Sequence, residues 1–180
     1  SGMTLAQHEA RLAHDLDCLG FGGADWTRTD APDDQHIHDV VIVGGGQSGI
    51  ATAYALKRDQ IDNVVVIDKA AYGREGPWVT FARMRTLRSP KDYPGPDLGV
   101  PSLTYQSWHE ASFGEQAWVA LDLIPTGHWN DYLLWLRKVL EIDVRNETAL
   151  TAIHPLEGCL RAEIETAACE RSYIHAKKIV

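Results

Sequence analysis

Residues 39–58 read DVVIVGGGQSGIATAYALKR, and residues 64–68 read VVVID. The apolar, β-branched runs at 39–43 and 64–68 are typical of strands that are buried on both faces. A glycine-rich turn and a helix of small residues, from Ile50 to about Arg58, lie between the two runs. Strand, turn, helix and strand within about thirty residues predict a parallel βαβ unit with a right-handed crossover.

The glycines have the spacing of a dinucleotide-binding turn, G-x-G-x-x-G. We expect Gly44 to let the chain turn sharply off the strand, Gly46 to let a pyrophosphate approach the backbone, and Gly49 to let the helix pack closely on the sheet. N–H groups at the start of the helix would then face the phosphates. The candidate phosphate-binding residues form one run, Gly44, Gly45, Gly46, Gln47, Ser48 and Gly49.

An acidic residue ends the second predicted strand. Asp68 follows the last glycine of the turn by about twenty residues, where a carboxylate can accept hydrogen bonds from ribose hydroxyls. A carboxylate at this position repels a 2′-phosphate, so the site should prefer FAD or NAD over NADP. Asp68 and the adjacent Lys69 therefore join the candidate site. The alternative is a structural turn with a coincidental acid.

The rest of the sequence predicts a helix before this unit and a β-meander after it. Residues 4–19 carry apolar residues on one helical face, and a polar linker at 24–39 follows them. Residues 70–125 are irregular and rich in proline and tryptophan, and a second amphipathic helix lies near 129–140. Four β-like runs follow, near residues 142–146, 149–154, 159–166 and 172–180.

The predicted fold class is α/β, a Rossmann-like FAD- or NAD(P)-binding fold with a parallel βαβ start and a β-meander. We divide the chain into residues 1–38, comprising a two-residue cloning scar, the helix and the linker, and residues 39–180. The final β-like run is still apolar where the sequence stops. We therefore expect residues 39–180 to be the N-terminal portion of an FAD-binding domain, truncated before its completion.

Composition and charge limit the kinds of partner. The net charge of −8, with no long basic run, argues against nucleic acid and anionic membrane. No run reaches the ~18 apolar residues of a membrane span, and no signal peptide is visible, so we expect a cytoplasmic protein. His36 and His38 lack a third ligand nearby, so we predict no metal site.

The cysteines exclude one class of flavoprotein. Flavin disulfide reductases need a redox pair of cysteines shortly after the second strand. This chain has no cysteine between Cys18 and Cys159, and Cys169 also lacks redox spacing. A relay between a flavin and a thiol pair is therefore not expected.

The sequence after Asp68 favours FAD over NAD. A plain NAD dehydrogenase would soon place another helix and strand, whereas here roughly seventy irregular residues come first. Such an insertion is expected where a cap must cover a flavin and exclude water. An NAD-binding dehydrogenase-like domain, and a unit that binds no nucleotide, remain the alternatives.

From Asp39 onward the sequence resembles the flavin-containing monooxygenases and the related N-hydroxylating and Baeyer–Villiger enzymes. The resemblance rests on the glycine turn, Asp68, the Gly76-Pro77-Trp78 element and the run from Leu87 to Asp92. It implies that Trp78 packs near the cofactor. It also implies that Arg88 and Ser89 lie near the flavin, although Ser89 replaces a Thr-Asn pair of the family motif.

The resemblance implies an enzyme, an NADPH-dependent flavoprotein monooxygenase with FAD as cofactor and a small-molecule substrate. We identify no catalytic side chain, which agrees with chemistry supplied mainly by the flavin. In this family the NADPH-binding fold and the completion of the FAD site follow the segment that ends at Val180. The chain alone is therefore not expected to turn over.

Two further expectations concern the surface. A basic cluster could neutralise the FAD pyrophosphate or guide a nicotinamide phosphate, or it could be a solvated patch. Its members are Arg83, Arg85, Arg88 and Lys91. An open sheet edge should also promote self-association of the chain.

Overall fold

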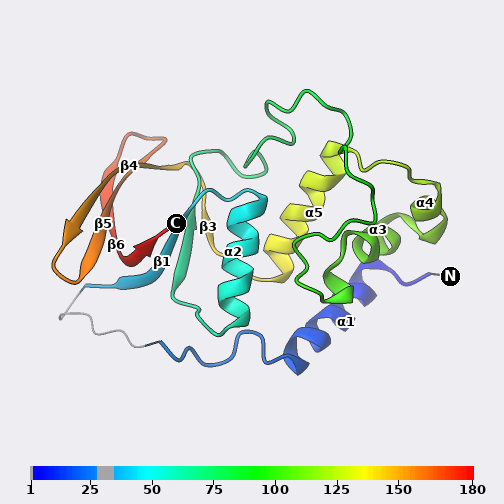
Figure 1. Cartoon of the computed structure of the whole chain (residues 1–180), viewed down its shortest axis with the longest axis horizontal. Helices are drawn as coiled ribbons and strands as arrows, with labels where there is room; N and C mark the ends of the chain where they lie inside the picture. The colour runs from blue at the N-terminus through cyan, green and yellow to red at the C-terminus, as the bar shows by residue number, and fades with distance from the viewer. Residues whose placement is uncertain (1, 28–34) are drawn as a thin grey trace. The chain divides into compact units, whose positions relative to one another are not determined.

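The chain forms two compact units, which are described separately. One, the helical unit, comprises Ser1–Phe21 and Pro77–Glu141, and the other, the sheet unit, comprises Gly22–Gly76 and Ile142–Val180. The computed structural model, drawn in Figure 1, describes residues 2–27 and 35–180. Part of the predicted linker, at residues 28–34, and the first residue of the predicted scar lie outside the described residues.

The sheet unit begins with the predicted parallel βαβ arrangement. Strand β1 (Ile37–Val43) leads through the glycine turn to helix α2 (Gln47–Arg58) and then to strand β2 (Val64–Ile67). The two strands are parallel, in a register that pairs Val40 with Val64 and Val43 with Ile67. The prediction is confirmed, except that α2 begins at Gln47, ahead of the predicted Ile50.

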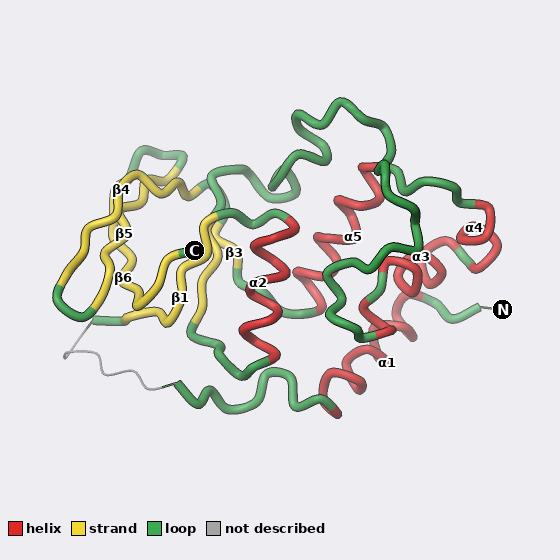
Figure 2. The backbone as a smooth tube through the Cα atoms, in the orientation of Figure 1, coloured by secondary structure: helices red, strands yellow, loops and turns green. Residues whose placement is uncertain are grey.

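Four more strands complete this sheet. They are β3 (Val144–Arg145), β4 (Thr148–Leu156), β5 (Cys159–Thr166) and β6 (Arg171–Ile179), and the strand order is β3-β2-β1-β6-β5-β4. Strands β4, β5 and β6 pair antiparallel and confirm three runs of the predicted meander, whereas the first predicted run, near residues 142–146, contains β3, which pairs parallel with β2. Figure 2 shows the strands gathered within this unit.

Strand β6 also pairs with β1, and this pairing is parallel. The register matches Ile37 with His175 and Val41 with Ile179. Beyond β6, the Val180 N–H donates to the Val41 carbonyl at 2.9 Å, and the Val43 N–H donates to the Val180 carbonyl at 2.8 Å. The strand that carries the glycine turn is therefore held on both edges.

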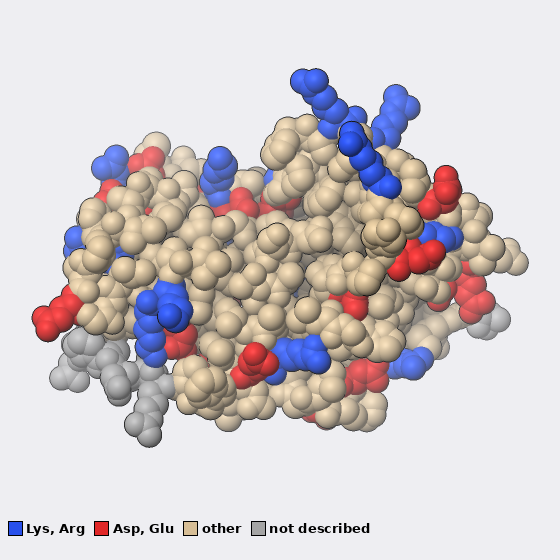
Figure 3. Space-filling model, in the orientation of Figure 1, with Lys and Arg blue, Asp and Glu red and all other residues tan. Residues whose placement is uncertain are grey.

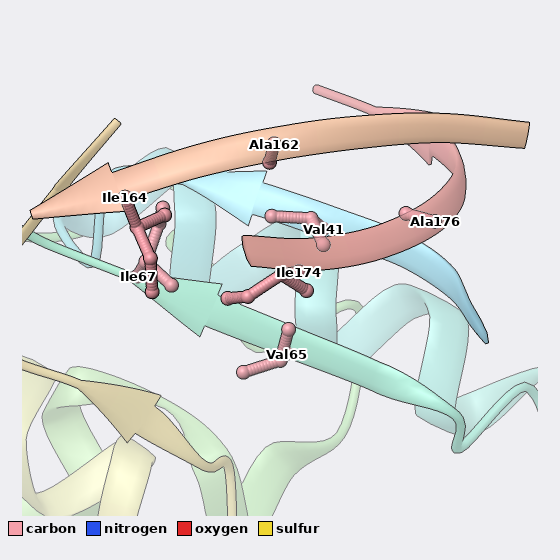
Figure 4. Packing of buried hydrophobic residues seen from close by; sticks show 7 residues of the cluster. All are labelled: Val41, Val65, Ile67, Ala162, Ile164, Ile174 and Ala176. Atoms are coloured by element: carbon pink, nitrogen blue, oxygen red, sulfur yellow. The ribbon is translucent and has the colours of Figure 1, made fainter. Parts of the chain in front are cut away.

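The core of the sheet unit joins the parallel strands to the meander. Figure 4 shows the side chains that β1 and β2 contribute, packed with those of β5 and β6. Val41 and Ile67 are fully buried, as the continuous apolar runs predict. The cluster consists of Val41, Val65, Ile67, Ala162, Ile164, Ile174 and Ala176.

The helical unit contains the predicted N-terminal helix. Helix α1 (Leu5–Cys18) starts at a capping box, in which Thr4 accepts from the Gln7 N–H and the Gln7 side chain accepts from the Thr4 N–H. Its buried face includes His8, whose Nε2 lies 2.8 Å from the carbonyl of Ser102. The Ser102 hydroxyl donates in turn to Asp15 at 2.6 Å, so α1 is fixed within this unit.

The prediction that residues 70–125 are irregular is wrong in part. This stretch contains a 3₁₀ turn, η1 (Pro101–Leu103), and the helices α3 (Tyr105–Phe113) and α4 (Glu115–Ala120). Both helices are too short to display a clear apolar period. The N-cap of α3, Thr104, accepts from the Ser107 N–H. Helix α5 (Thr126–Val139) matches the second predicted amphipathic helix.

Figure 3 shows acidic and basic side chains dispersed over the face that it presents, with basic side chains close together at the upper right edge. Among the described residues, no helix combines the length and the apolarity that a membrane crossing needs.

Candidate nucleotide-binding site

The glycine turn connects the end of β1 to the start of α2. Gly44 has φ +113°, a conformation that favours glycine, and its N–H donates to the Ile67 carbonyl at 2.8 Å. Gly46 is the N-cap of α2, and its carbonyl accepts from the Ile50 N–H at 3.0 Å. The N-terminus of α2 therefore follows the turn directly, and first-turn N–H groups with a positive dipole end are suited to an anion.

Gly49 is required by packing. A Cβ at this position would lie 1.7 Å from the Gly44 carbonyl oxygen, which no side chain can tolerate. The sequence predicted close packing between helix and sheet, and Ile42 does lie nearby at 3.5 Å from such a Cβ. The severe clash, however, is with the carbonyl of the turn itself.

Neither the backbone conformation nor the packing at position 46 requires a glycine. Its φ of −76° and ψ of −168° are open to any residue. A Cβ would meet nothing closer than the Gly76 Cα, at 3.6 Å. A methyl group at Gly46 would therefore fit the protein itself but would occupy the space beside the turn, where a phosphate must approach the backbone.

Asp68 lies at the end of β2 with its carboxylate against the turn. One oxygen, Oδ2, accepts from the Gly45 N–H at 2.7 Å, and Oδ1 accepts from the Ala70 N–H at 2.7 Å. The side chain is buried. A carboxylate offers about four lone-pair positions, so these two bonds leave acceptor capacity for ribose hydroxyls.

The remaining predicted residues of the sheet unit lie around this turn. Gln47 and Ser48 form the first turn of α2, with Gln47 half-buried and Ser48 exposed. Lys69 follows Asp68 and is exposed. Gly45 is buried, and a Cβ there would lie 3.0 Å from a methyl group of Val144 in β3. The structure thus brings the glycine turn, Asp68 and Lys69 to one end of the parallel strands.

Sequence reasoning missed the loop at residues 70–76 and its partner Asn146. The Asn146 side-chain amide donates to the Ala70 carbonyl at 3.0 Å and to the Glu75 carboxylate at 2.6 Å. Gly76, which ends this loop, has φ +71° and is the closest neighbour of Gly46. The position of Asn146 follows from the strand pairing, because the short strand β3 is parallel to β2 and places Asn146 beside the end of β2.

Trp78, Arg88 and Ser89 belong to the helical unit, whereas the glycine turn belongs to the sheet unit. Trp78 is half-buried and lies edge-on to Trp129, with ring centroids 6.3 Å apart. Its buried indole N–H has no hydrogen-bond partner among the described residues. Arg88 and Ser89 are exposed beside the buried Leu87.

Lys91, a member of the predicted basic cluster, has its ammonium bound to backbone carbonyls. Its ammonium donates to the carbonyls of Trp118, at 2.7 Å, and Leu121, at 2.6 Å, and it lies 4.5 Å from the centroid of the Trp118 ring. These carbonyls lie at the C-terminal end of α4, where a cation is favourable. Lys91 therefore has a structural role, whereas Arg83, Arg85 and Arg88 are exposed.

His36 and His38 lie next to each other at the start of β1. The rings of His36 and His38 lie edge-to-face, 4.4 Å apart. Within residues 2–27 and 35–180, no group of three or more His, Cys, Asp or Glu side chains could hold a metal ion. Burial, and secondarily the charge of His36, lowers the pKa of His38 to about 4, so its imidazole is neutral at pH 7.

Comparison with known proteins connects this site to flavoenzymes. The family model described as "FAD dependent oxidoreductase" matches residues 39–165. The chain is 53% identical over 153 residues to the FAD-dependent urate hydroxylase of Xanthomonas campestris pv. campestris. The match covers 85% of this chain and 32% of that protein, so the chain spans about a third of this relative's length.

Solved structures share the fold at low sequence identity. The ornithine hydroxylase of Pseudomonas aeruginosa aligns over 80% of this chain and 38% of its own, with a TM-score of 0.68 and 19% identity. An FAD-bound cadaverine monooxygenase of Erwinia amylovora aligns over 81% of this chain and 35% of its own, with a TM-score of 0.60 and 13% identity. These likenesses confirm the predicted Rossmann-like FAD-binding fold.

Proposed function

Because the chain belongs to the family of FAD-dependent oxidoreductases, we propose that residues 44–49 bind the pyrophosphate of FAD and that Asp68 binds the ribose of its adenosine half. The observation that carries this proposal is Gly46. Neither its backbone conformation nor its packing needs glycine, so the close approach of a ligand is the remaining physical reason for a missing side chain.

The residues of the sheet unit suit the adenosine half of FAD. Backbone N–H groups at the start of α2 would hold the phosphates, and Asp68 would accept from ribose hydroxyls while it keeps its bond to Gly45. Lys69 lies next to Asp68 and would add positive charge for the phosphates. From the helical unit, we assign Trp78, Arg88 and Ser89 to the flavin half.

FAD, when bound, supplies the redox and oxygen-transfer chemistry, and the chain's own residues bind it, orient it and exclude water. The indole N–H of Trp78 has no partner within residues 2–27 and 35–180, which supports a contact with a polar atom of the cofactor. No catalytic side chain is assigned, because no described residue has a role in proton transfer that the geometry supports.

The activity of the whole protein is a second part of the proposal. The 53% identity to an FAD-dependent urate hydroxylase supports hydroxylation of urate or a related oxidised purine, and we propose NADPH as the reductant. The substrate is therefore a small, planar heterocycle rather than an amine or a thiol.

Cofactor binding is tested by titrating the chain with FAD, and separately with NAD, while absorbance and flavin fluorescence are followed. We expect saturable binding of FAD, weakened in Gly46→Ala and unchanged in Gly127→Ala, where a Cβ would meet nothing within 4 Å. Gly46→Ala should keep the stability of the parent chain. Equal FAD affinity in the parent and Gly46→Ala would contradict the assignment of the turn, and binding of NAD without FAD would favour a dehydrogenase-like domain.

Activity is tested on the full-length protein. We expect oxidation of NADPH, followed by its absorbance, to depend on urate and to be coupled to urate loss. NADPH oxidation that is stimulated by an amine but not by urate would contradict the substrate assignment while leaving the FAD site intact.

A further inference from the structure

We propose that Asn146 and Glu75 form a clasp that positions Gly76 beside the glycine turn and thereby preorganises the FAD site; this inference rests on the function proposed above. Both residues are positioning residues and neither is expected to touch the cofactor. The clasp joins the loop that follows β2 to the connection between β3 and β4, and all of its parts lie in the sheet unit.

The centre of the clasp is the side-chain amide of Asn146. Its Nδ2 donates to the Ala70 carbonyl at 3.0 Å and to the Glu75 carboxylate at 2.6 Å. An amide nitrogen carries two hydrogens, so both are used. Because Ala70 and Glu75 begin and nearly end the loop at residues 70–76, one side chain closes the whole loop.

The segment that carries Asn146 is itself fixed on both sides. The Glu147 N–H donates to the Ala70 carbonyl at 3.1 Å, and the Thr148 N–H donates to the Asp68 carbonyl at 2.9 Å. The Thr148 hydroxyl donates to the Asn146 carbonyl at 2.9 Å. The backbone around Asn146 is therefore fixed independently of Glu75, so the Asn146 side chain can hold the loop at residues 70–76 in place.

The loop in turn sets the surroundings of Gly46. Glu75 is 5% exposed, so its hydrogen bond to Asn146 is shielded from water. A charge-assisted hydrogen bond is stronger in such a shielded place than in water. The next residue, Gly76, lies with its Cα and N at 3.6 and 3.7 Å from the position of a Cβ on Gly46. A shift of the loop would thus widen or close the space in which a phosphate meets the turn.

Asp68 completes the arrangement from the other side. Its carboxylate joins the Gly45 N–H to the Ala70 N–H, so the turn and the start of the loop share one acceptor group. Asn146 then continues the connection to Glu75 and Gly76. This continuous chain of hydrogen bonds preorganises the site before any ligand arrives, which lowers the cost of binding.

The test compares Asn146→Asp with the rescuing pair Asn146→Asp, Glu75→Gln. Aspartate has the shape of asparagine but only acceptors, so it repels Glu75, whereas the glutamine of the pair can donate to the new aspartate. Asn63→Asp is the matched control, because Asn63 Nδ2 also donates to a backbone carbonyl of this unit, that of Ile37 at 2.8 Å. Asn146→Ser, a smaller change, replaces Asn146→Asp if that variant does not fold.

The first readout is amide hydrogen exchange of residues 44–49 and 70–76 in the FAD-free chain. We expect exchange there to be about tenfold faster in Asn146→Asp, partly restored in the pair, where the contact with residue 75 returns but the Ala70 carbonyl still lacks the side-chain donor, and unchanged in Asn63→Asp. Equal exchange in Asn146→Asp and the parent, or equal acceleration in Asn63→Asp, would overturn the clasp. Amide exchange tests the clasp even if the parent chain does not bind FAD. Failure of the parent chain to bind FAD would count against the proposed function and not against the clasp.

The second readout is the Kd for FAD. We expect it to rise about tenfold in Asn146→Asp and to return part of the way in the pair, at unchanged stoichiometry. Faster exchange with an unchanged Kd would show that the loop is fixed by Asn146 but is not needed by the cofactor, which would overturn the assignment as positioning residues.

Discussion

The carboxylate of Asp68, which we predicted to bind a ribose, is hydrogen-bonded to the glycine turn, since its Oδ2 accepts from the Gly45 N–H at 2.7 Å. The acid at the end of β2 therefore has a structural task in the chain itself, beside any contact with a ribose. Its second oxygen is engaged as well, by the Ala70 N–H. Loss of these two hydrogen bonds should change the stability of the chain, which can be measured.

Asp68→Ala should therefore lower both stability and FAD affinity. The Gly45 and Ala70 N–H groups would lose their acceptor, and we expect the free energy of unfolding to fall by about 1–3 kcal/mol. Urea denaturation of the FAD-free chain measures this loss. Asp92→Ala, at an exposed aspartate, is the control and should change stability by less than about 0.5 kcal/mol. An Asp68→Ala chain as stable as its parent would contradict the structural role.

Gly49→Ala should destabilise the sheet unit severely. The added Cβ would lie 1.7 Å from the Gly44 carbonyl oxygen, so the turn or the helix must move. We expect a loss of about 2–4 kcal/mol in chemical denaturation. Gly127→Ala, at an open position in α5, should be neutral or stabilising by up to about 1 kcal/mol. Similar effects of the two substitutions would refute the steric reason.

Lys91→Met should affect stability and leave FAD binding alone. Methionine keeps an apolar stem but removes the donors to the Trp118 and Leu121 carbonyls, so we expect a loss of about 1–3 kcal/mol. Arg85→Gln, at an exposed residue, serves as the control for stability. A weaker affinity for FAD in Lys91→Met, at unchanged stability, would restore Lys91 to the phosphate-binding cluster.

Stability should also fall between pH 6.5 and 4 because of His38. The folded-state pKa of about 4 is below the ordinary value of 6.5, so the unfolded chain binds more protons in this window. The stabilisation is fully present above pH 6.5 and is lost as the pH falls toward 4. Burial is the main cause, and the nearby charges are those of His36, Arg145, Asp143 and Asp39.

The measurement is the Tm of the chain between pH 7 and 4.5, compared with His38→Gln. The variant should show a shallower decline, since glutamine does not titrate. His36→Gln should keep most of the decline of the parent, because burial of His38 is unaffected. A decline of the same size in His38→Gln would assign the effect to other groups.

Much of the sheet unit could be predicted from local sequence. The runs at 39–43 and 64–68 gave the two parallel strands because strands buried on both faces need continuous apolar residues. The meander was predicted from β-like runs of the right length. Gly44 followed from its position alone, since a chain that leaves a strand for a helix at once needs an unusual backbone conformation.

What escaped prediction depends on contacts between distant residues. Nothing near Asn146 in the sequence indicates that Ala70 and Glu75 will lie within reach of its amide. The same holds for Lys91, whose carbonyl partners come from a short helix that has no clear apolar period. Positive charge suggested a phosphate ligand, but three-dimensional packing gave Lys91 backbone partners instead.

The parallel pairing of β6 with β1 also has a consequence for how the molecule is made. A ribosome releases β1 and the glycine turn early, yet β6, one of the two neighbours that flank β1, is among the last residues of these 180 to be synthesised. Contacts so distant in sequence form slowly, because a long loop must close first. Until β6 emerges, the nascent β1 exposes an unpaired edge, so the strand that leads into the glycine turn gains its second neighbour only after residues 171–179 have been synthesised.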